Sequence, residues 1–528
     1  MALDLIIRGG TIHDGQAGAP YAADIGIAKG RIAEIGRITD AAERIVDADG
    51  LVVSPGFIDI HAHSDYTLLI DPRAVTALKQ GVTLEVLGNC GFGCAPIGKP
   101  ADAAGSIYGY DGSVPLDWRD TDGYLNRLER ARPAINVLTL VPNGQLRRTV
   151  VGMQDRPANA EERKKMAAAL REGLEQGAFG YSTGLEYPVE RAVSEDEIFE
   201  LCAVVAKAGA LYATHTRDRD VAAVEGIEEA VRTAERTGVR LQVSHLLPRT
   251  TRNGEDRRAV EVIDDARARG VDVAFDQHTR LYGTTYLNTI LPPWAHDGGR
   301  SGLIAHLKSG DSRARMKTYP SIVAFGGWDR VVLLDNPAFP EFSRQSFGDL
   351  GRKLNHDPHD IAFDVLLGEI DQLHRPMVII NAYTQEQQER TFAHALCMPG
   401  SDATTLAPDG PLSSAMFHGA YSWASWYFRF MVNERKSLSA AEAIHRLTGL
   451  PASVMGLDDR GAIRVGARAD IAVFDAENFR EHATTFEPNQ LATGMKHVVV
   501  NGALALDAER LTENRAGQVL RRKTGVSF

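Results

Sequence analysis

The sequence is poor in several features that would mark particular classes of protein. Its 528 residues include only four cysteines, too few for a disulfide scaffold. The spacing of Cys90 and Cys94 fits neither a zinc ribbon nor a thioredoxin motif. No apolar run reaches the roughly 18 residues of a membrane span, and the start MALDLIIRGG lacks the apolar stretch of a signal peptide. We therefore expect a cytoplasmic protein with no membrane partner.

Positive charge is also scarce. The chain carries 58 Lys and Arg against 69 Asp and Glu, which gives a formal net charge of -11. No run of basic residues could neutralise a phosphate backbone, so we expect no nucleic-acid partner. Hydrophobic residues make up 44% of the chain and charged residues 24%, proportions that allow a large buried core. The oligomeric state stays open.

Both ends of the chain have the residue pattern of small antiparallel strands. Residues 1–54 alternate short apolar runs with Gly and Asp turn signals, as in DLIIRGGTIHDG and RIVDADGLVVSPG. The same pattern returns in GAIRVGARADIAVFD and HVVVNGALAL. We expect residues 1–54 and 455–528 to form one small β-sandwich domain, so that the two ends of the chain meet.

Residues 55–454 instead repeat a strand followed by a helix. Helical spacing of apolar residues is evident over 194–208 and 221–237. The apolar runs are GFIDIHAH, TLEVLGN, INVLTLV, AFGYST, ALYATH, RLQVSH, VDVAFD and ALCMPGSD. Eight strand–helix units predict an α/β fold, a closed TIM-like (β/α)8 barrel rather than an open sheet. We expect residues 55–454 to form this one barrel domain.

One stretch interrupts this rhythm. Residues 281–345 are rich in Trp, Pro, Gly and mixed charge, which is typical of an inserted lid or subdomain. The run PMVIINA, over 376–382, adds a further candidate strand.

The strongest chemical signal is the segment PGFIDIHAH. In a strand, residues two apart point to the same face, so Asp59, His61 and His63 would all project into the barrel. Two imidazoles placed in this way can share one metal ion. The competing interpretation is a pair of hydrogen-bonded histidines at the end of a strand.

Four more candidates end other expected strands, namely Cys90, His215, His245 and Asp402. In a barrel these ends lie on one rim, where active sites are built. Taken singly, a buried Cys or His is more often a packing residue. Together, imidazole and thiolate form a set that selects zinc. Asp402 could then transfer the proton of an attacking water, which indicates metal-assisted hydrolysis of an amide.

These residues resemble the amidohydrolase superfamily, and within it the N-acyl-D-amino-acid deacylases, or D-aminoacylases. The resemblance covers nearly the whole chain. Its motifs are IIRGGTIHDG, PGFIDIHAHSD, KQGVTLEVLGNCG, GAFGYSTGLEYP, THTRD, QVSHL, LPPWAHDGG, PGSD and GAIRVGARADIAVFD. GNCG is the discriminating segment, because most of the superfamily has a carboxylated lysine where this subgroup has cysteine.

The resemblance implies a TIM-like barrel flanked by a small β-domain, with specific roles for the residues that match. It implies zinc held tightly by Cys90, His215 and His245. A second, weaker site would involve His61, His63 and Cys90. Asp402 matches the general acid and base, and Tyr187 matches a tyrosine that contacts the reacting carbonyl group. The alternative interpretation of Tyr187 is a residue at the rim of the barrel that only packs on the lid.

The expected substrate pocket departs from the family pattern. Leu247 stands where these deacylases carry a lysine, and residues 401–419 contain no arginine after Asp402. A buried α-carboxylate without a cation costs several kcal/mol. Arg280, Arg249 or Arg217 could replace the anchor, unless they are solvated arginines. Trp423 in GAYSWASWYFRF could line an aromatic pocket, or belong to the buried face of a helix.

Three functions follow from these observations. The first is a zinc-dependent hydrolase that cleaves the linear amide bond of a small molecule. The second is a hydrolase of a neutral, aryl or cyclic amide without a free α-carboxylate, which the missing lysine and arginine favour. The third, more remote, is a metal-free binding or structural homologue.

Overall fold

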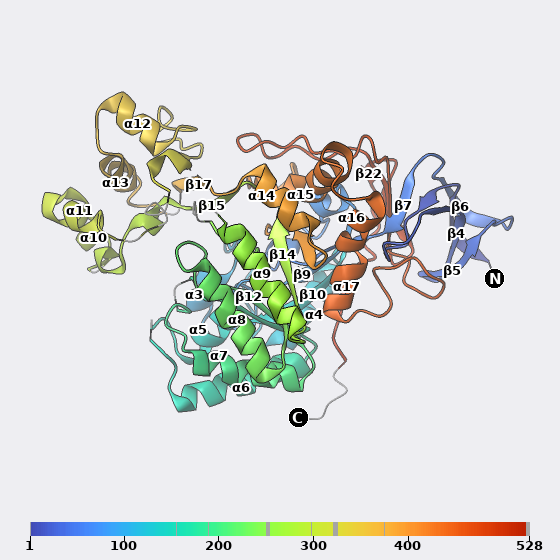
Figure 1. Cartoon of the computed structure of the whole chain (residues 1–528), viewed down its shortest axis with the longest axis horizontal. Helices are drawn as coiled ribbons and strands as arrows, with labels where there is room; N and C mark the ends of the chain where they lie inside the picture. The colour runs from blue at the N-terminus through green and yellow to red at the C-terminus, as the bar shows by residue number, and fades with distance from the viewer. Residues whose placement is uncertain are drawn as a thin grey trace.

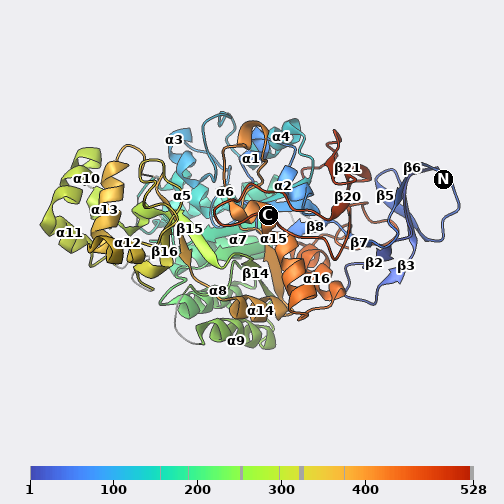
Figure 2. The ribbon, with the colours of Figure 1, turned by 90° about the horizontal axis from the view of Figure 1, so that it is seen from above.

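The molecule is elongated, with a central barrel between two smaller parts. The computed structural model describes residues 2–523 except 155, 188, 250–253, 297, 320, 322–325 and 374. Figure 1 shows the N-terminal strands at one end of the barrel and helices α10 to α13 at the other. Figure 2, turned by 90°, shows the same order of parts. The two smaller parts therefore flank opposite sides of the barrel.

The central sheet has eight parallel strands, which confirms the expected TIM-like barrel. Their order is β8, β9, β10, β11, β12, β13, β14 and β18, so that sequence neighbours pair until the insertion before β18. All residues of β9, β10, β11 and β14 are buried, as expected when both faces of a parallel sheet are covered. Their bounds are Phe57–Asp59, Val82–Leu87, Asn136–Pro142, Gly180–Gly184, Leu211–His215, Arg240–Val243, Val273–His278 and Cys397–Gly400.

The barrel closes where β8 meets β18, just beyond the ends of both strands. Ala62 and Ala403 form a parallel bridge. The amide of Asp402 donates to the carbonyl oxygen of His61 at 2.8 Å, and the amide of His63 donates to that of Ala403 at 2.8 Å. These hydrogen bonds bring two candidate site segments together in the same step that closes the barrel.

Helices cover the outside of the barrel. Helix α7 begins as its sequence predicts, because the Ser194 side chain accepts from the amide of Glu197 and caps the first turn. The main covering helices are α4 (Thr121–Ala131), α5 (Asn143–Val150), α6 (Ala160–Glu175), α7 (Glu195–Lys207), α8 (Ala223–Thr237), α9 (Glu255–Ala268), α14 (Gln385–Ala393), α15 (His418–Phe428), α16 (Ala440–Leu447) and α17 (Gly449–Met455). Shorter helices are α1 (Thr67–Ile70), α2 (Val75–Leu78) and α3 (Pro100–Ala103). None of the described helices is both long enough and apolar enough to cross a bilayer.

Two sheets built from both ends of the chain lie beside the barrel. One contains β1 (Leu3–Arg8), β4 (Asp24–Ala28), β5 (Arg31–Gly36) and β6 (Ala42–Asp47). The other contains β2 (Thr11–Ile12), β3 (Tyr21–Ala22), β7 (Val52–Pro55), β19 (Ile471–Phe474), β20 (Met495–Val500), β21 (Ala503–Asp507) and β22 (Arg510–Leu511). Strand β7 pairs antiparallel with β19, and residues of both sheets share one apolar cluster. The ends of the chain therefore meet through main-chain hydrogen bonds.

The last described residues do not stay with these sheets, although we expected 455–528 to do so. Val519 forms a parallel bridge with Val137 in β10, and Leu520 donates to the carbonyl oxygen of Val137 at 2.7 Å. The Leu520 side chain packs on the apolar cluster inside the barrel. The tail thus covers the amino ends of the strands, because the apolar interior would otherwise be exposed there.

The insertion is longer than the expected 281–345. Strand β17 (Met377–Asn381) lies between β15 (Tyr282–Tyr286) and β16 (Val331–Leu333), so the sheet needs a segment from beyond residue 345. An apolar cluster over 287–380 packs this sheet against α10 (Gly299–Lys308), α11 (Gly310–Met316), α12 (Phe347–Leu354) and α13 (Pro358–Gly368). The described part of the insertion has a core of its own.

A buried ion pair on the outside of the barrel provides a test of the packing. Arg147 in α5 and Glu197 in α7 are fully buried, and the second carboxylate oxygen of Glu197 accepts from the amide of Ala158 at 3.1 Å. Removing one partner leaves an unpaired buried charge, so Glu197→Ala should lower the free energy of unfolding by about 3–5 kcal/mol. Chemical denaturation measures it. The control is Glu200→Ala on the same helix, whose exposed pair with Arg163 should contribute about 1 kcal/mol or less; equal losses would contradict the assignment.

Candidate metal centre

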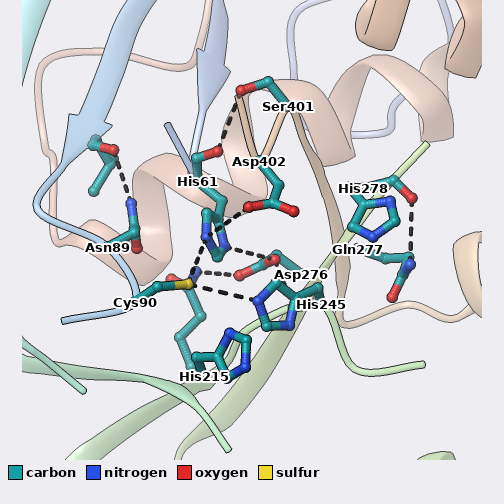
Figure 3. A network of polar contacts seen from close by, with 12 residues as sticks. His61, Asn89, Cys90, His215, His245, Asp276, Gln277, His278, Ser401 and Asp402 are labelled. Atoms are coloured by element: carbon teal, nitrogen blue, oxygen red, sulfur yellow. Dashed lines mark hydrogen bonds and ion pairs between the residues drawn. The ribbon is translucent and has the colours of Figure 1, made fainter. Parts of the chain in front are cut away.

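The thiol of Cys90 lies at the centre of a cluster of histidines at the carboxyl ends of the barrel strands. Sγ is 3.1 Å from Nε2 of His61 and 3.5 Å from Nε2 of His245. Its side chain also contacts those of His215 and His63. Figure 3 shows Cys90 between His61, His215 and His245. The structure therefore brings together side chains from four different strand ends.

Two overlapping groups of side chains have the geometry of metal ligands. One consists of His61, Cys90 and His245, and the other of His61, His63 and Asp402. Within each group the ligand atoms all lie within 4.8 Å of one another. Thiolate and imidazole are the donors that zinc prefers. Only the first of these two groups includes the sulfur, and His215, whose side chain also contacts that sulfur, lies outside both.

The backbone at this site is strained. Cys90, His245 and Asp402 have positive φ angles of 55°, 35° and 43°, which side chains other than glycine adopt rarely. Each such residue costs on the order of 1–3 kcal/mol and is retained where function requires it. All three lie two or three residues beyond the end of a barrel strand, where the turn of the backbone directs their side chains toward a common point.

The charges of the cluster suit metal binding. Burial would raise the pKa of the Cys90 thiol, but His61 and hydrogen bonds from His215 and His245 hold that pKa well below its usual value. Burial lowers the pKa of His245 to about 4, assisted by the charge of Arg219. These shifts favour the thiolate of Cys90 and the neutral imidazole of His245, the forms that bind a metal ion. Burial would lower the pKa of the other three rings, but the charge of Cys90 helps to raise the pKa of His61, His63 and His215, and these rings would release a proton on binding a metal ion.

Asp402 lies between two histidines and an arginine. Its Oδ1 is 3.3 Å from Nε2 of His63 and 3.6 Å from Nε2 of His61, while Oδ2 accepts from Arg280 at 2.8 Å. Burial would raise the pKa of Asp402, but the hydrogen bond with His63 and the charge of Arg280 hold it well below its usual value. The carboxylate is thus ionised and held in place from both sides.

His215 is turned partly away from the ligand groups. Its Nε2 lies 2.8 Å from Oε2 of Glu186, and its Nδ1 lies 3.3 Å from the hydroxyl of Tyr187. The ring nevertheless packs against His245, with 4.5 Å between the ring centroids. Burial would raise the pKa of Glu186, but Arg249 and His215 hold it well below its usual value. His215 is therefore tied to a carboxylate that sequence reasoning did not single out.

Asp276 is a second carboxylate whose role was missed. Its Oδ1 is 3.0 Å from Nδ1 of His61 and accepts from the amide of His245 at 2.8 Å, while Oδ2 accepts from Gln242 at 2.6 Å. It orients His61 so that Nε2 faces Cys90 (Figure 3). The signal was present in the strand VAFDQH, where Asp276 and His278 share one face.

The residues expected to bind the substrate are engaged elsewhere. Arg249 pairs with Glu186 and also with Asp220 at 2.9 Å, and Arg280 pairs with Asp402. Their charges are thus already balanced. Leu247 is fully buried, and its amide donates to Gln277 at 3.0 Å.

Trp423 also lies away from the expected position. It is 2% exposed and belongs to the main apolar core, on α15 against α2. The helical spacing around it reflects a buried helix face rather than the wall of a pocket. An aromatic wall comes instead from Tyr108, whose ring stacks on His63 with centroids 5.1 Å apart, and from Phe92, edge-on to Tyr187 at 4.9 Å. These two residues carried no distinctive pattern in the sequence.

Comparison with known proteins gives a consistent result. A family model described as the amidohydrolase family matches residues 44–296 and 399–505, and most of the insertion lies between them. The chain is 33% identical to the N-acyl-D-glutamate deacylase of Alcaligenes xylosoxydans xylosoxydans, over 99% of this chain and 98% of that protein. It is 30% identical to the N-acyl-D-glutamate deacylase of Bordetella bronchiseptica solved with zinc and a phosphonate mimic of the tetrahedral intermediate (TM-score 0.81, covering 99% and 100%). A D-aminoacylase structure with a binuclear metal centre is 28% identical (TM-score 0.82, covering 98% and 100%).

Metal analysis of two cysteine variants tests the centre. Cys90→Ala removes the sulfur shared by the four histidines and should lower zinc affinity by at least about 100-fold, since losing the partner of a ligand alone costs 10–100-fold. Zinc content after dialysis measures it. Cys94→Ala is the control, because this buried thiol lies in the same loop, outside both ligand groups. Full zinc retention in Cys90→Ala would refute the assignment.

Proposed function

This chain belongs to the amidohydrolase family, and we propose that it is a zinc-dependent enzyme that hydrolyses the linear amide bond of N-acyl amino acids. The observation that carries the proposal is the Cys90 sulfur in contact with four imidazoles, with the Asp402 carboxylate beside them. A cysteine that served only to fill space would not be surrounded by ionisable side chains, because burying charged groups in the protein interior costs free energy.

We propose that Cys90, His215 and His245 hold the tightly bound zinc ion, and that His61 and His63 with Cys90 hold a weaker second ion. The binuclear centre of the D-aminoacylase relative supports two sites. Bound zinc polarises an amide carbonyl and makes water more acidic at neutral pH.

Asp402 is proposed as the group that moves the proton. As an ionised carboxylate it accepts a proton from the attacking water and returns it to the nitrogen of the leaving amine. Arg280 donates to the carbonyl oxygen of Ser401 at 2.6 Å as well as to Asp402, so it fixes the carboxylate from its far side. Arg280 is therefore proposed as a positioning residue for Asp402 rather than an anchor for substrate.

Tyr187 is proposed to donate a hydrogen bond to the oxygen of the reacting carbonyl. Burial holds the pKa of its phenol well above the usual value, so the hydroxyl keeps its proton at pH 7. The hydroxyl lies beside His215, at the edge of the metal cluster. A neutral donor placed there stabilises the charge that develops on the oxygen during hydrolysis.

A neutral amide is the second candidate substrate. The pairing of Arg249 with Glu186 and of Arg280 with Asp402 favours it, because neither cation is left for an α-carboxylate. The two candidates share the metal chemistry and differ only in the charge of the substrate.

Asp402→Asn tests the chemistry. The variant should keep its zinc but lose at least about 100-fold in kcat, because it cannot transfer the proton. Acetate release from a panel of N-acetyl-D-amino acids and their carboxamides measures it, on protein of known zinc content. Asp409→Asn, an exposed carboxylate in the following turn, should keep full activity. Turnover by Asp402→Asn close to that of the wild type would remove Asp402 from the mechanism.

A further inference from the structure

The arginines beside the metal cluster differ in how their charge is balanced. The described loops after β12, β13 and β14 contain four of them, Arg217, Arg219, Arg249 and Arg280. Arg217 pairs with Glu229 at 2.7 Å, and the pairs of Arg249 and Arg280 are given above. Arg219 forms an ion pair with no described carboxylate. Its charge acts on Glu186, which already pairs with Arg249, so Arg219 is the one guanidinium of this set without a carboxylate of its own among the described residues.

Arg219 is nevertheless buried, with 7% of its surface exposed. Its Nη2 donates to the carbonyl oxygens of His245 at 2.8 Å and Leu247 at 3.2 Å, and to the hydroxyl of Tyr383 at 2.8 Å. All three acceptors are neutral, and no described residue accepts from Nε or Nη1. A buried cation in this state is costly unless an anion joins it.

His278, near Tyr383, is a second buried side chain with an unpaired polar atom. His278 is 2% exposed, and its Nδ1 has no partner among the described residues. Its ring centroid lies 5.5 Å from that of Tyr383 and 6.4 Å from that of His245. Burial holds the pKa of His278 well below its usual value, with the charges of Arg280 and Arg219 adding to the effect. The His278 ring, with one nitrogen unpaired among the described residues, thus lies near both Tyr383, which bonds to Arg219, and His245 of the metal cluster.

We propose that Arg219, together with Tyr383 and His278, binds the carboxylate of the amino-acid part of the substrate. The inference rests on the proposed hydrolysis of N-acyl amino acids. It names the residue that recognises the negative charge of the substrate. The planar guanidinium offers paired N–H donors that match a carboxylate. Arg219 also donates to the carbonyl oxygen of Leu247, so its charge lies beside the segment that follows His245.

The inserted segment takes part in this site. Tyr383 follows β17 directly and reaches the loops of the barrel through its hydroxyl. The carboxylate site is therefore formed by the barrel and the end of the insertion together.

A matched pair of substrates separates charge recognition from a structural role. The probes are the N-acetyl-D-amino acid with the highest kcat/KM and its primary carboxamide, with acetate release as the signal. The wild type should prefer the acid by about 100-fold in kcat/KM, which is the factor that corresponds to the free energy of a hydrogen bond to a charged group. Arg219→Gln should bring this preference close to unity, mainly through a higher KM for the acid. Arg219→Lys should restore part of it, and Tyr383→Phe should reduce it.

The control is Arg217→Gln, which removes a neighbouring cation already paired with Glu229 and should leave the preference unchanged. Zinc content and thermal midpoints of all variants are measured alongside. Equal losses on both substrates in Arg219→Gln would show a purely structural role and overturn the inference. A wild type that cleaves the carboxamide as well as the acid would also overturn it, while leaving the amidohydrolase function intact. Failure of the zinc-loaded wild type to cleave any amide would instead refute the proposed function.

Discussion

The site depends on one buried thiolate. A sulfur anion in the interior of a barrel is stable only if positive or hydrogen-bonding groups surround it, and four imidazoles do so here. Asp276 holds one of these rings in the orientation that faces the sulfur, and Glu186 holds another. The positive φ of Cys90 directs the sulfur into the cluster, and the carboxylates bonded to the histidines fix the rings around it.

Barrel closure and assembly of the catalytic groups are the same event. The hydrogen bond from the amide of Asp402 to the carbonyl oxygen of His61 joins the last strand to the first, and the side chains of these two residues meet on the inner side of that bond. A change that loosens this closure would separate the carboxylate from the metal cluster. Stability and chemistry are therefore coupled at this position.

Much of the fold followed from the sequence, because each strand is a short apolar run with its own boundaries. All eight runs became barrel strands, and His61 and His63 were marked by simple alternation. Features that depend on contacts between distant segments could not be predicted from such local patterns. Asp276 gained its role only through pairing with His61 across the barrel, and Trp423 was ambiguous because a buried helix face and a pocket wall share one spacing. The true extent of the insertion depended on β17, which joins its sheet from far along the chain.

The tail that covers the floor of the barrel has a consequence for biosynthesis. Because Val519 and Leu520 bond to a strand that begins at Asn136, the floor stays open until these two residues have been synthesised, long after β10 itself. Most of the nascent barrel leaves the ribosome with its apolar interior uncovered at that end. Sealing of the barrel thus follows the synthesis of all eight of its strands, and a chain truncated before Val519 would expose an apolar floor prone to association.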